Sequence, residues 1–310
     1  MRSPLIEALG RLGSGRGLTG AEAEAAVGVI MAGEASEPAI AAFLTALRIK
    51  GETADELAGA VAAVRARMAP WDATRPPRPL LDTCGTGGDG ANTVNVSTAT
   101  ALVVAACGVP VAKHGNRSAS GNSGSAEVLT ELGVAIETSP EVLHRGLTDL
   151  GLVFFFAPSF HPALRFAAPV RRQLPFRTLF NLVGPLANPA RPEYQLIGTA
   201  GECQADLVAE ALLRLGTLRA AVVTGSDGLD EVTLDGPTRV RWVESGRIAR
   251  TTWEQADFGL PRISARALRV SGPAESAARI RDLLGGEPGP VRDLVLANSA
   301  AALRVAGAVE

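Results

Sequence analysis

Beyond residue 80 the chain alternates short apolar runs with helical segments, and this alternation restricts its fold more than any other feature. The apolar runs expected to form strands lie at residues 80–84, 109–112, 134–136, 152–156, 195–198 and 220–224. Helical periodicity fills the segments between them, at residues 97–107, 125–132, 140–150, 162–174 and 202–215. Strands separated by helices favour a mostly parallel sheet with helices on its faces. The sequence therefore predicts an α/β fold for this part of the chain.

The first 69 residues carry helical periodicity only. Thr19 with Glu22 and Thr53 with Glu56 each match a capping box, in which a hydroxyl accepts a backbone N–H and the glutamate bonds back. Apolar residues follow each box at helical spacing. Four helices without a strand predict a small all-α domain at the N-terminus.

The expected domain boundary lies in residues 70–79, which include four prolines. The sequence predicts a helical domain and an α/β domain, with bounds 1–75 (joined by the helical segment 162–187) and 76–310. Toward the C-terminus, residues 238–252 are expected to form a β-hairpin around Glu244-Ser245-Gly246. Two further helices are expected near residues 274–284 and 291–306.

Composition and charge argue against several classes of protein. The 310 residues are 46% hydrophobic and 20% charged, as in a globular protein with a sizeable core. A net charge of −2 argues against nucleic-acid binding through general positive charge. Cys84, Cys107 and Cys203 show no paired spacing, so neither a disulfide framework nor a zinc site is expected and a reducing cytoplasm fits. The N-terminus has no apolar signal core, and no apolar run reaches membrane-spanning length.

Two strand-to-helix junctions have the composition of a phosphate-binding site. The first contains Gly85-Thr86-Gly87-Gly88-Asp89 and then Asn95-Val96-Ser97-Thr98. The second contains Lys113-His114-Gly115-Asn116-Arg117-Ser118 and then Ser123-Gly124-Ser125. Glycines let the backbone approach a ligand closely, hydroxyls at a helix start add donors, and the lysine adds a point charge. Because ligands bind outside the carboxyl ends of parallel strands, both junctions are expected at one sheet edge, with residues 225–231.

Each of these features has an ordinary structural explanation when it stands alone. A Gly-rich turn is usually only a turn, and this one matches neither the Walker loop nor the dinucleotide fingerprint. Arg171-Arg172 alone is more typical of a solvated basic pair, and Asp230-Glu231 of a solvated turn after a strand. His114 alone is more typical of a structural histidine. The combination of both junctions is what indicates phosphate binding.

Together these motifs resemble the anthranilate phosphoribosyltransferase family over nearly the whole chain. The shared motifs are Gly-Thr-Gly-Gly-Asp at 85–89, Asn-x-Ser-Thr at 95–98, Lys-His-Gly-Asn-Arg at 113–117, Gly-Ser-Ala at 124–126, Arg171-Arg172, Arg-Thr-Leu-Phe-Asn at 177–181, Gly-Pro-Leu at 184–186, Asn188-Pro189 and Asp230-Glu231. The resemblance implies transfer of the phosphoribosyl group from 5-phosphoribosyl 1-diphosphate to anthranilate, in tryptophan biosynthesis. It also implies a cytoplasmic homodimer associated through the helical domain, a site between the two domains, and neither nucleic acid nor membrane as a partner.

By position in these motifs, the resemblance assigns three sets of residues. The donor set, for 5-phosphoribosyl 1-diphosphate with Mg²⁺, is Gly85, Gly88, Asp89, Thr93, Asn95, Val96, Ser97, Thr98, Lys113, His114, Gly115, Asn116, Arg117, Ser118, Ala119, Ser120, Gly121 and Ser125. The anthranilate set is Gly85, Asn116 and Arg171. The metal set is Ser97, Asp230 and Glu231, whose hard oxygen atoms suit Mg²⁺. No residue is assigned as a general acid or base.

The chain departs from the family pattern at three places. Gly121 stands where a serine is usual, and Pro175 stands where a glycine usually follows the helix that carries Arg171. The family usually continues for a further helix beyond Glu310.

Two alternative functions remain open. A pyrimidine-nucleoside phosphorylase shares the fold and the phosphate loops, but it lacks His-Gly-Asn in its lysine loop and the Asp-Glu pair. A non-catalytic, nucleic-acid-binding relative is disfavoured by the near-neutral charge and by Asp230-Glu231.

Overall fold

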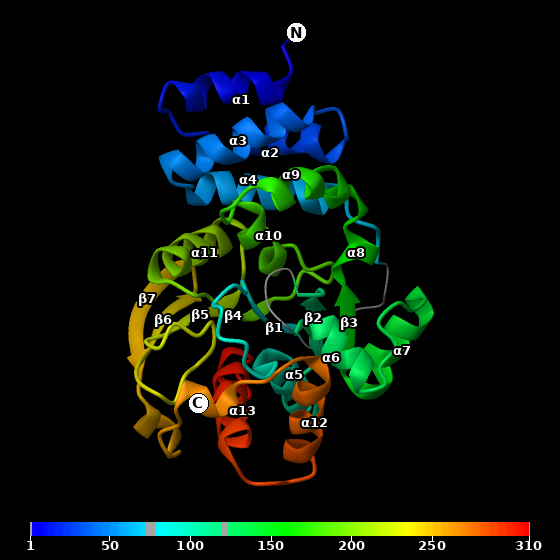
Figure 1. Ribbon diagram of the computed structural model, residues 1–310, viewed down its shortest axis with the longest axis vertical. Coiled ribbons are helices and arrows are strands. Elements are labelled where there is room, and N and C mark those ends of the chain that lie inside the picture. The colour runs from blue at the N-terminus through cyan, green and yellow to red at the C-terminus, as the bar shows by residue number, and fades with distance from the viewer. Residues whose placement is uncertain (1, 72–78, 119–122, 310) are drawn as a thin grey trace.

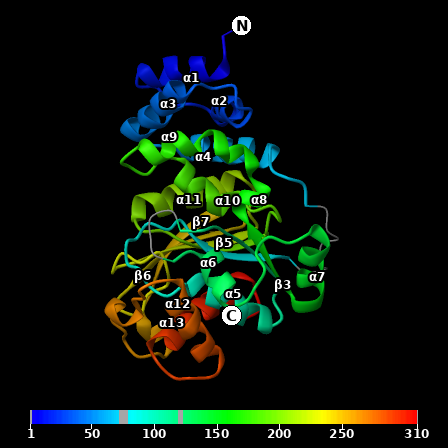
Figure 2. The same cartoon turned by 45° about the vertical axis from the view of Figure 1, so that its right-hand side comes forward.

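The computed structural model describes residues 2–71, 79–118 and 123–309, and Figures 1 and 2 show a bundle of helices stacked on a larger α/β part. The N-terminal helices are α1 (Pro4–Gly13), α2 (Gly20–Met31), α3 (Glu37–Lys50) and α4 (Ala54–Ala66). The later helix α9 (Ala168–Gln173) lies against α3. The prediction of a small helical domain at the N-terminus is confirmed.

Both expected capping boxes are present. Thr19 Oγ1 accepts the Glu22 N–H at 3.3 Å, and Glu22 Oε2 accepts the Thr19 N–H at 2.9 Å. Thr53 and Glu56 repeat this arrangement at 3.3 and 2.8 Å, and the buried Glu56 also accepts the Leu18 N–H at 2.9 Å. Local sequence therefore sets these two helix starts, because the side chains satisfy N–H groups that have no partner inside the helix.

One seven-stranded sheet forms the centre of the α/β part, in the order β3-β2-β1-β4-β5-β6-β7. Its strands are β1 (Leu81–Gly85), β2 (Val111–Gly115), β3 (Leu152–Phe156), β4 (Tyr194–Gly198), β5 (Arg219–Gly225), β6 (Thr238–Glu244) and β7 (Arg247–Trp253). Strands β1 to β5 pair in parallel, while β6 pairs antiparallel with β5 and with β7. The predicted mostly parallel sheet and C-terminal hairpin are confirmed.

Helices cover both faces of this sheet. Those outside the N-terminal bundle are α5 (Val96–Ala106), α6 (Ser125–Glu131), α7 (Pro140–Leu150), α8 (Ala157–Phe160), α10 (Phe180–Leu186), α11 (Glu202–Arg214), α12 (Pro273–Leu284) and α13 (Pro290–Val305). Short 3-10 helices are η1 (Pro162–Phe166), η2 (Gln255–Phe258) and η3 (Ala265–Leu268). Figure 1 shows α10 and α11 between the sheet and α4, and α5, α12 and α13 on the opposite side.

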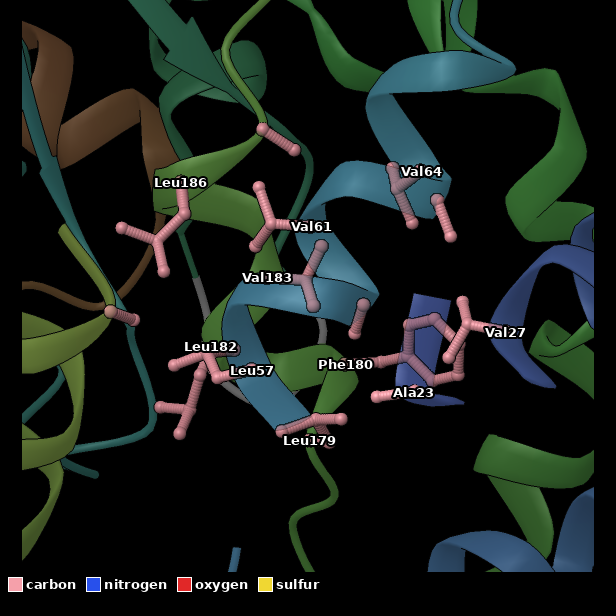
Figure 3. Packing of buried hydrophobic residues seen from close by; sticks show 14 of the residues in the cluster. Ala23, Val27, Leu57, Val61, Val64, Leu179, Phe180, Leu182, Val183 and Leu186 are labelled. Atoms are coloured by element: carbon pink, nitrogen blue, oxygen red, sulfur yellow. The ribbon is translucent and has the colours of Figure 1, made fainter. Parts of the chain in front are cut away.

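Side chains alternate between the two faces of the sheet, and each face buries its own core. Ala220 of β5 belongs to the core that includes α10 and α11, whereas its neighbour Ala221 belongs to the core that includes α5 and α13. The first core continues into the helical bundle, and Figure 3 shows Val61 of α4 beside Val183 and Leu186 of α10. A continuous apolar core therefore joins the bundle to one face of the sheet.

Two expectations about secondary structure were wrong. Residues 134 and 135 are irregular and residue 136 lies in a bend, so no strand forms there, and Val134 is 42% exposed. No strand is inserted there because β2 and β3 pair directly, from Val111 with Leu152 to Gly115 with Phe156. Residues 162–174 do not form one helix but are divided at Ala167 between η1 and α9. Pro169 lies in the first turn of α9, and its missing N–H favours a new helix start over continuation.

The topology sets where a ligand can bind. The carboxyl ends of β1, β2, β4 and β5 lie at the same edge of the sheet because these strands are parallel. The loops after β1, β2 and β5 are the ones that carry most of the polar residues singled out in the sequence. Within the described ranges, no helix has the length and apolar character needed to cross a membrane.

Candidate active site

The Gly-rich loop, residues 85–90, leaves the carboxyl end of β1 and is held from two directions. Asp230 Oδ2 accepts the Gly87 N–H at 2.8 Å. Arg177 donates to the Gly87 carbonyl oxygen through Nη1 and to the Thr86 carbonyl oxygen, at 2.7 Å, through Nη2. A carboxylate and a guanidinium therefore set the orientation of this peptide segment.

Close approach of these side chains explains three of the glycines. At Gly88, where φ is +78°, a Cβ atom would lie 1.6 Å from Arg177 Nη1. At Gly85 a Cβ atom would lie 2.3 Å from Asp230 Oδ2, and at Gly198 it would lie 1.5 Å from the Asp230 carbonyl oxygen. Only glycine leaves room for Arg177 and Asp230 at these positions.

Lys113 in β2 brings a buried cation to the same edge. The residue is 3% exposed, and its Nζ donates to the Thr83 carbonyl oxygen and, at 3.2 Å, to the Ser97 hydroxyl at the start of α5. Burial lowers the pKa of Lys113, and the negative charges of Asp82 and Glu231 act in the opposite direction. The first and second junctions therefore meet at this lysine.

A second contact joins the two junctions. Asn95 Nδ2 donates to the Ser123 carbonyl oxygen at 3.3 Å, and its Oδ1 accepts the Ser123 hydroxyl at 2.7 Å. The Ser125 hydroxyl donates to the Asn116 carbonyl oxygen at 3.3 Å. It also lies close to Gly115, where an added Cβ atom would be only 2.2 Å from the Ser125 Oγ. Hydroxyls and amides from both junctions therefore gather in one place.

Asp230 and Glu231 follow the turn after β5 and are half-buried. Burial raises the pKa of Asp230 to about 7, and the charge of Asp89 adds to the rise. Burial likewise raises the pKa of Glu231 well above its usual range, with the charge of Asp230 as the next cause. A divalent cation would offset this desolvation and repulsion.

The donor set at this place fits Mg²⁺. The carboxylates of Asp230 and Glu231 and the hydroxyl of Ser97 are hard oxygen ligands. Among the described residues, no group of three or more histidine, cysteine, aspartate or glutamate side chains is arranged to hold a metal ion. Substrate oxygens and water therefore have to complete the coordination, as is common for Mg²⁺ beside phosphates.

Asp82 is the second residue of β1 and is fully buried. Its Oδ1 accepts the His114 N–H at 3.2 Å, and its Oδ2 accepts Asn188 Nδ2 at 2.8 Å. Burial raises the pKa of Asp82 to about 6, while Lys113 and Asn188 oppose the rise. Asn188 Nδ2 also donates to the Ala112 carbonyl oxygen at 2.7 Å, so this pair sets the position of β2 relative to β1.

His114 and His161 are both buried, and their rings meet edge to face with centroids 5.1 Å apart. His114 Nδ1 lies 3.0 Å from the Gly184 carbonyl oxygen, which can only accept, so Nδ1 carries the proton. Burial lowers the pKa of His114 to about 3 and that of His161 to about 4, which keeps both rings neutral. His114 Nε2 finds no hydrogen-bond partner among the described residues and offers a free lone pair.

Arg171 belongs to α9, the helix that packs on the bundle. The residue is half-buried, and its guanidinium carbon lies 5.7 Å from the centroid of the Phe180 ring. Burial lowers the pKa of Arg171. In the described part of the chain, its guanidinium makes neither a hydrogen bond nor an ion pair. A cation in this situation is available to an anionic ligand.

A cavity of about 230 Å³ lies beside Arg177, where the bundle meets the α/β part. Its lining residues come from both parts and are Arg48, Gly51, Glu52, Arg177, Thr178, Asn181, Leu182, Cys203, Gln204 and Leu207. Arg177 therefore faces the Gly-rich loop on one side and this cavity on the other.

The structure brings together residues that lie far apart in the sequence. Gly85, Ser97, Lys113, Asp230 and Glu231 share one sheet edge through the contacts given above. Val96 and Thr98 are buried in the first turn of α5.

Other predicted site residues lie at the margins or outside the described chain. Thr93 forms an isolated bridge with Arg269, and Arg117 lies 4.0 Å from Glu137 in an exposed ion pair. Ala119, Ser120 and Gly121 are outside the described residues. Pro175 follows the end of α9 at Gln173, so it does not interrupt the helix that carries Arg171.

Sequence reasoning missed the roles of Arg177, Asp82 and Asn188. Arg177 and Asn188 occur in motifs that supported the resemblance, but their partners are 90 and 106 residues away. Asp82 had a detectable signal, because an acidic residue inside an apolar strand needs a buried partner.

The chain joins a helical bundle to an α/β domain, and loops with the composition of a phosphate-binding site meet at the edge of its sheet. This combination defines a class of glycosyl transferases. The model of the glycosyl transferase family helical bundle domain matches residues 6–68, and that of the glycosyl transferase family a/b domain matches residues 77–310. The anthranilate phosphoribosyltransferase of Chloroflexus aggregans is 50% identical over 307 residues, covering 98% of this chain and 88% of the relative. That of Moorella thermoacetica is 48% identical over 297 residues, covering 96% and 87%. The chain belongs to the anthranilate phosphoribosyltransferase family.

Solved structures agree with this assignment. The anthranilate phosphoribosyltransferase from Thermus thermophilus superposes with a TM-score of 0.92 at 42% identity, covering 99% of this chain and 90% of that one. The enzyme from Saccharomyces cerevisiae in complex with PRPP and Mg superposes with a TM-score of 0.90 at 27% identity, covering 100% and 90%. Another structure of the yeast enzyme is in complex with 4-fluoroanthranilate.

Proposed function

We propose that the sheet edge described above is where this chain carries out the reaction of its family. The enzyme transfers the phosphoribosyl group from 5-phosphoribosyl 1-diphosphate to anthranilate and releases diphosphate, a step of tryptophan biosynthesis. The observation that carries this placement is the meeting of Lys113, the Ser97 hydroxyl and the Asp230-Glu231 pair beside the Gly-rich loop. Family membership favours this function over the two alternatives raised by the sequence.

The donor is assigned to the two junctions. The Gly-rich loop and the start of α5 present backbone N–H groups and hydroxyls, and Lys113 supplies positive charge. Asp230 and Glu231 with Ser97 would hold Mg²⁺, which would neutralise charge on the leaving diphosphate. The pKa of each carboxylate is raised by burial, which supports a cation as their missing partner.

Anthranilate is assigned to Arg171, with Asn116 and Gly85. A guanidinium suits a carboxylate because its planar fork donates two parallel hydrogen bonds. The unpaired charge of Arg171 in a half-buried position supports this role.

The reaction asks little of a protein base. The bond between ribose C1 and the diphosphate breaks, positive charge develops on the sugar, and the aromatic amine attacks C1 and then loses a proton to water. Lys113 and the backbone N–H groups stabilise the departing oxygen atoms, and binding both substrates in one place supplies the alignment. The chain's neutral histidines are therefore given no proton-transfer role.

The assembly, the location and the domain bounds are also part of this proposal. We infer a cytoplasmic homodimer associated through the helical bundle, with domains over residues 1–75 and 76–310 and with residues 162–187 joining the bundle. The packing of α9 on α3 supports the last point. Sedimentation of the purified chain would report its oligomeric state.

The experiment that tests the function follows the fluorescence of anthranilate. Adding the purified chain, Mg²⁺ and 5-phosphoribosyl 1-diphosphate should remove anthranilate and yield phosphoribosyl-anthranilate. Omitting any one of the three should stop the loss of fluorescence. Phosphorolysis of pyrimidine nucleosides in place of this reaction would contradict the proposal.

The Arg171→Ala variant should lose about 2–5 kcal/mol of interaction with anthranilate, because a carboxylate loses its charged partner. The loss should appear as a higher KM for anthranilate and a lower kcat/KM, with the KM of the donor nearly unchanged. The matched control is Arg172→Ala, because Arg172 is exposed on the same helix. An unchanged KM for anthranilate in Arg171→Ala would remove Arg171 from the site.

A further inference from the structure

The end of α10 is connected to three separate parts of the molecule. Carbonyl groups at a helix C-terminus have no partner within the helix. Here the Gly184 carbonyl oxygen accepts from the Ala187 N–H at the helix end at 3.2 Å and from His114 Nδ1 at 3.0 Å, and the Pro185 carbonyl oxygen accepts from Gln195 Nε2 at 2.9 Å. The Leu186 carbonyl oxygen accepts from Arg65 through Nε at 3.0 Å and Nη2 at 2.6 Å. Consecutive carbonyls thus join the second junction, β4 and the helical bundle.

We propose that Arg65 is a positioning residue through which the helical bundle sets the orientation of His114 in the substrate site. Arg65 lies on α4, 121 residues before its acceptor, and both of its donors converge on one carbonyl oxygen. A bidentate contact of this kind restrains both the distance and the direction of the acceptor. Its catalytic consequence rests on the proposed function, whereas the geometric effect on His114 does not.

The path from Arg65 to the site is short and consists of contacts already described. Two residues before Leu186, the Gly184 carbonyl oxygen accepts the Nδ1–H of His114, and this hydrogen bond directs Nε2 away from α10. Two residues after Leu186, Asn188 bonds Asp82, which in turn accepts the His114 backbone N–H. The end of α10 therefore restrains both the ring and the backbone of His114.

Among the described residues, the Arg65 guanidinium makes no hydrogen bond other than those to the Leu186 carbonyl oxygen. Burial lowers its pKa to about 10, the nearby Arg191 charge adds to this, and no carboxylate is paired with it in the described ranges. A half-buried arginine without a carboxylate is a costly way to hold two parts together. The same two parts are also joined by Arg214 of α11 and Asp55 of α4, at 2.6 Å, in a more exposed contact that does not touch α10.

The chain offers a direct probe of this proposal, because it contains only three histidines, namely His114, His144 and His161. Long-range ¹H–¹⁵N spectra of the histidine-labelled, substrate-free protein report the tautomer and environment of each ring. In Arg65→Ala, the His114 signals should shift toward a mixture of tautomers, while those of His144 stay unchanged. Arg214→Ala is the matched control and should leave all three rings unchanged.

Kinetics supply the second readout. In Arg65→Ala, kcat/KM for the donor should fall about tenfold, the size of a coupling carried through a packed network. Arg65→Lys keeps one charged donor. Compared with Arg65→Ala, its His114 signals and its kcat/KM for the donor should both lie closer to the wild-type values. Arg214→Ala should retain wild-type kinetics.

Two results would overturn the proposal. One is a native His114 spectrum in Arg65→Ala, and the other is an equal loss of activity in Arg65→Ala and Arg214→Ala. Where Arg65→Ala does not fold, Arg65→Lys is read in the same way, with a shifted His114 ring expected. The spectra are recorded without substrates, so failure of the proposed activity would leave this test valid.

Discussion

The double variant Asp230→Asn with Glu231→Gln is expected to keep its fold and lose nearly all turnover. Both carboxylates are assigned to Mg²⁺ beside the donor, and their amides retain size while losing charge. Losing the metal's stabilisation of the leaving group should cost about 4 kcal/mol of barrier, which is roughly a thousandfold in rate. The measurement is turnover against Mg²⁺ concentration at saturating donor, and the Mg²⁺ needed for half-maximal activity should rise sharply.

A control with the same change in charge separates this effect from general electrostatics. Asp282 and Glu287 are exposed beyond the site near the end of α12, so Asp282→Asn with Glu287→Gln should retain the wild-type magnesium curve. Circular dichroism should show that both double variants are folded. A wild-type magnesium curve for the Asp230 and Glu231 variant would show that the pair is only a polar turn.

The Gly88→Val variant should bind 5-phosphoribosyl 1-diphosphate far more weakly, and its turnover should fall about a hundredfold, the cost in rate of misplacing a substrate by an ångström. Two causes act together. Gly88 has φ of +78°, which a β-branched residue rarely adopts, and its added Cβ would lie 1.6 Å from Arg177 Nη1. Arg177 would have to leave the Gly87 and Thr86 carbonyls, so the loop would lose its orientation. Calorimetric titration with the donor measures the loss.

Gly216→Val separates backbone strain from crowding. Gly216 has φ of +75°, but nothing lies within 4 Å of its Cβ position. Its variant should lose stability through strain of about 1–3 kcal/mol and still bind the donor normally. If Gly88→Val also binds the donor normally, Gly88 is a turn residue without a role in the site.

The sequence by itself determined the features that depend on neighbouring residues. The capping boxes at Thr19 and Thr53 start their helices as predicted, because hydroxyl, glutamate and N–H groups lie within one turn. The alternation of apolar runs with helices predicted the mostly parallel sheet, and the positions of Lys113 and the Gly-rich loop at strand ends predicted their common edge. The role of each residue toward a substrate stays a prediction.

Local sequence patterns were insufficient to predict secondary structure where the same short segment is compatible with more than one structure. Residues 134–136 are apolar enough for a strand, but β2 and β3 leave no place for another strand between them. The apolar period of residues 162–174 predicted one helix, but the chain breaks at Ala167, before Pro169 in the first turn of α9.

Only the tertiary structure decided how the polar residues of the site are held. The bonds of Arg177 to the Gly-rich loop, of Asn188 to Asp82 and of Arg65 to the end of α10 span 90 to 121 residues. No spacing in the sequence encodes such pairs, because each depends on how the helices pack over the sheet. Burial then requires each of these groups to have a partner, since a charge or amide removed from water is stable only where the fold places a hydrogen-bonding or oppositely charged group beside it.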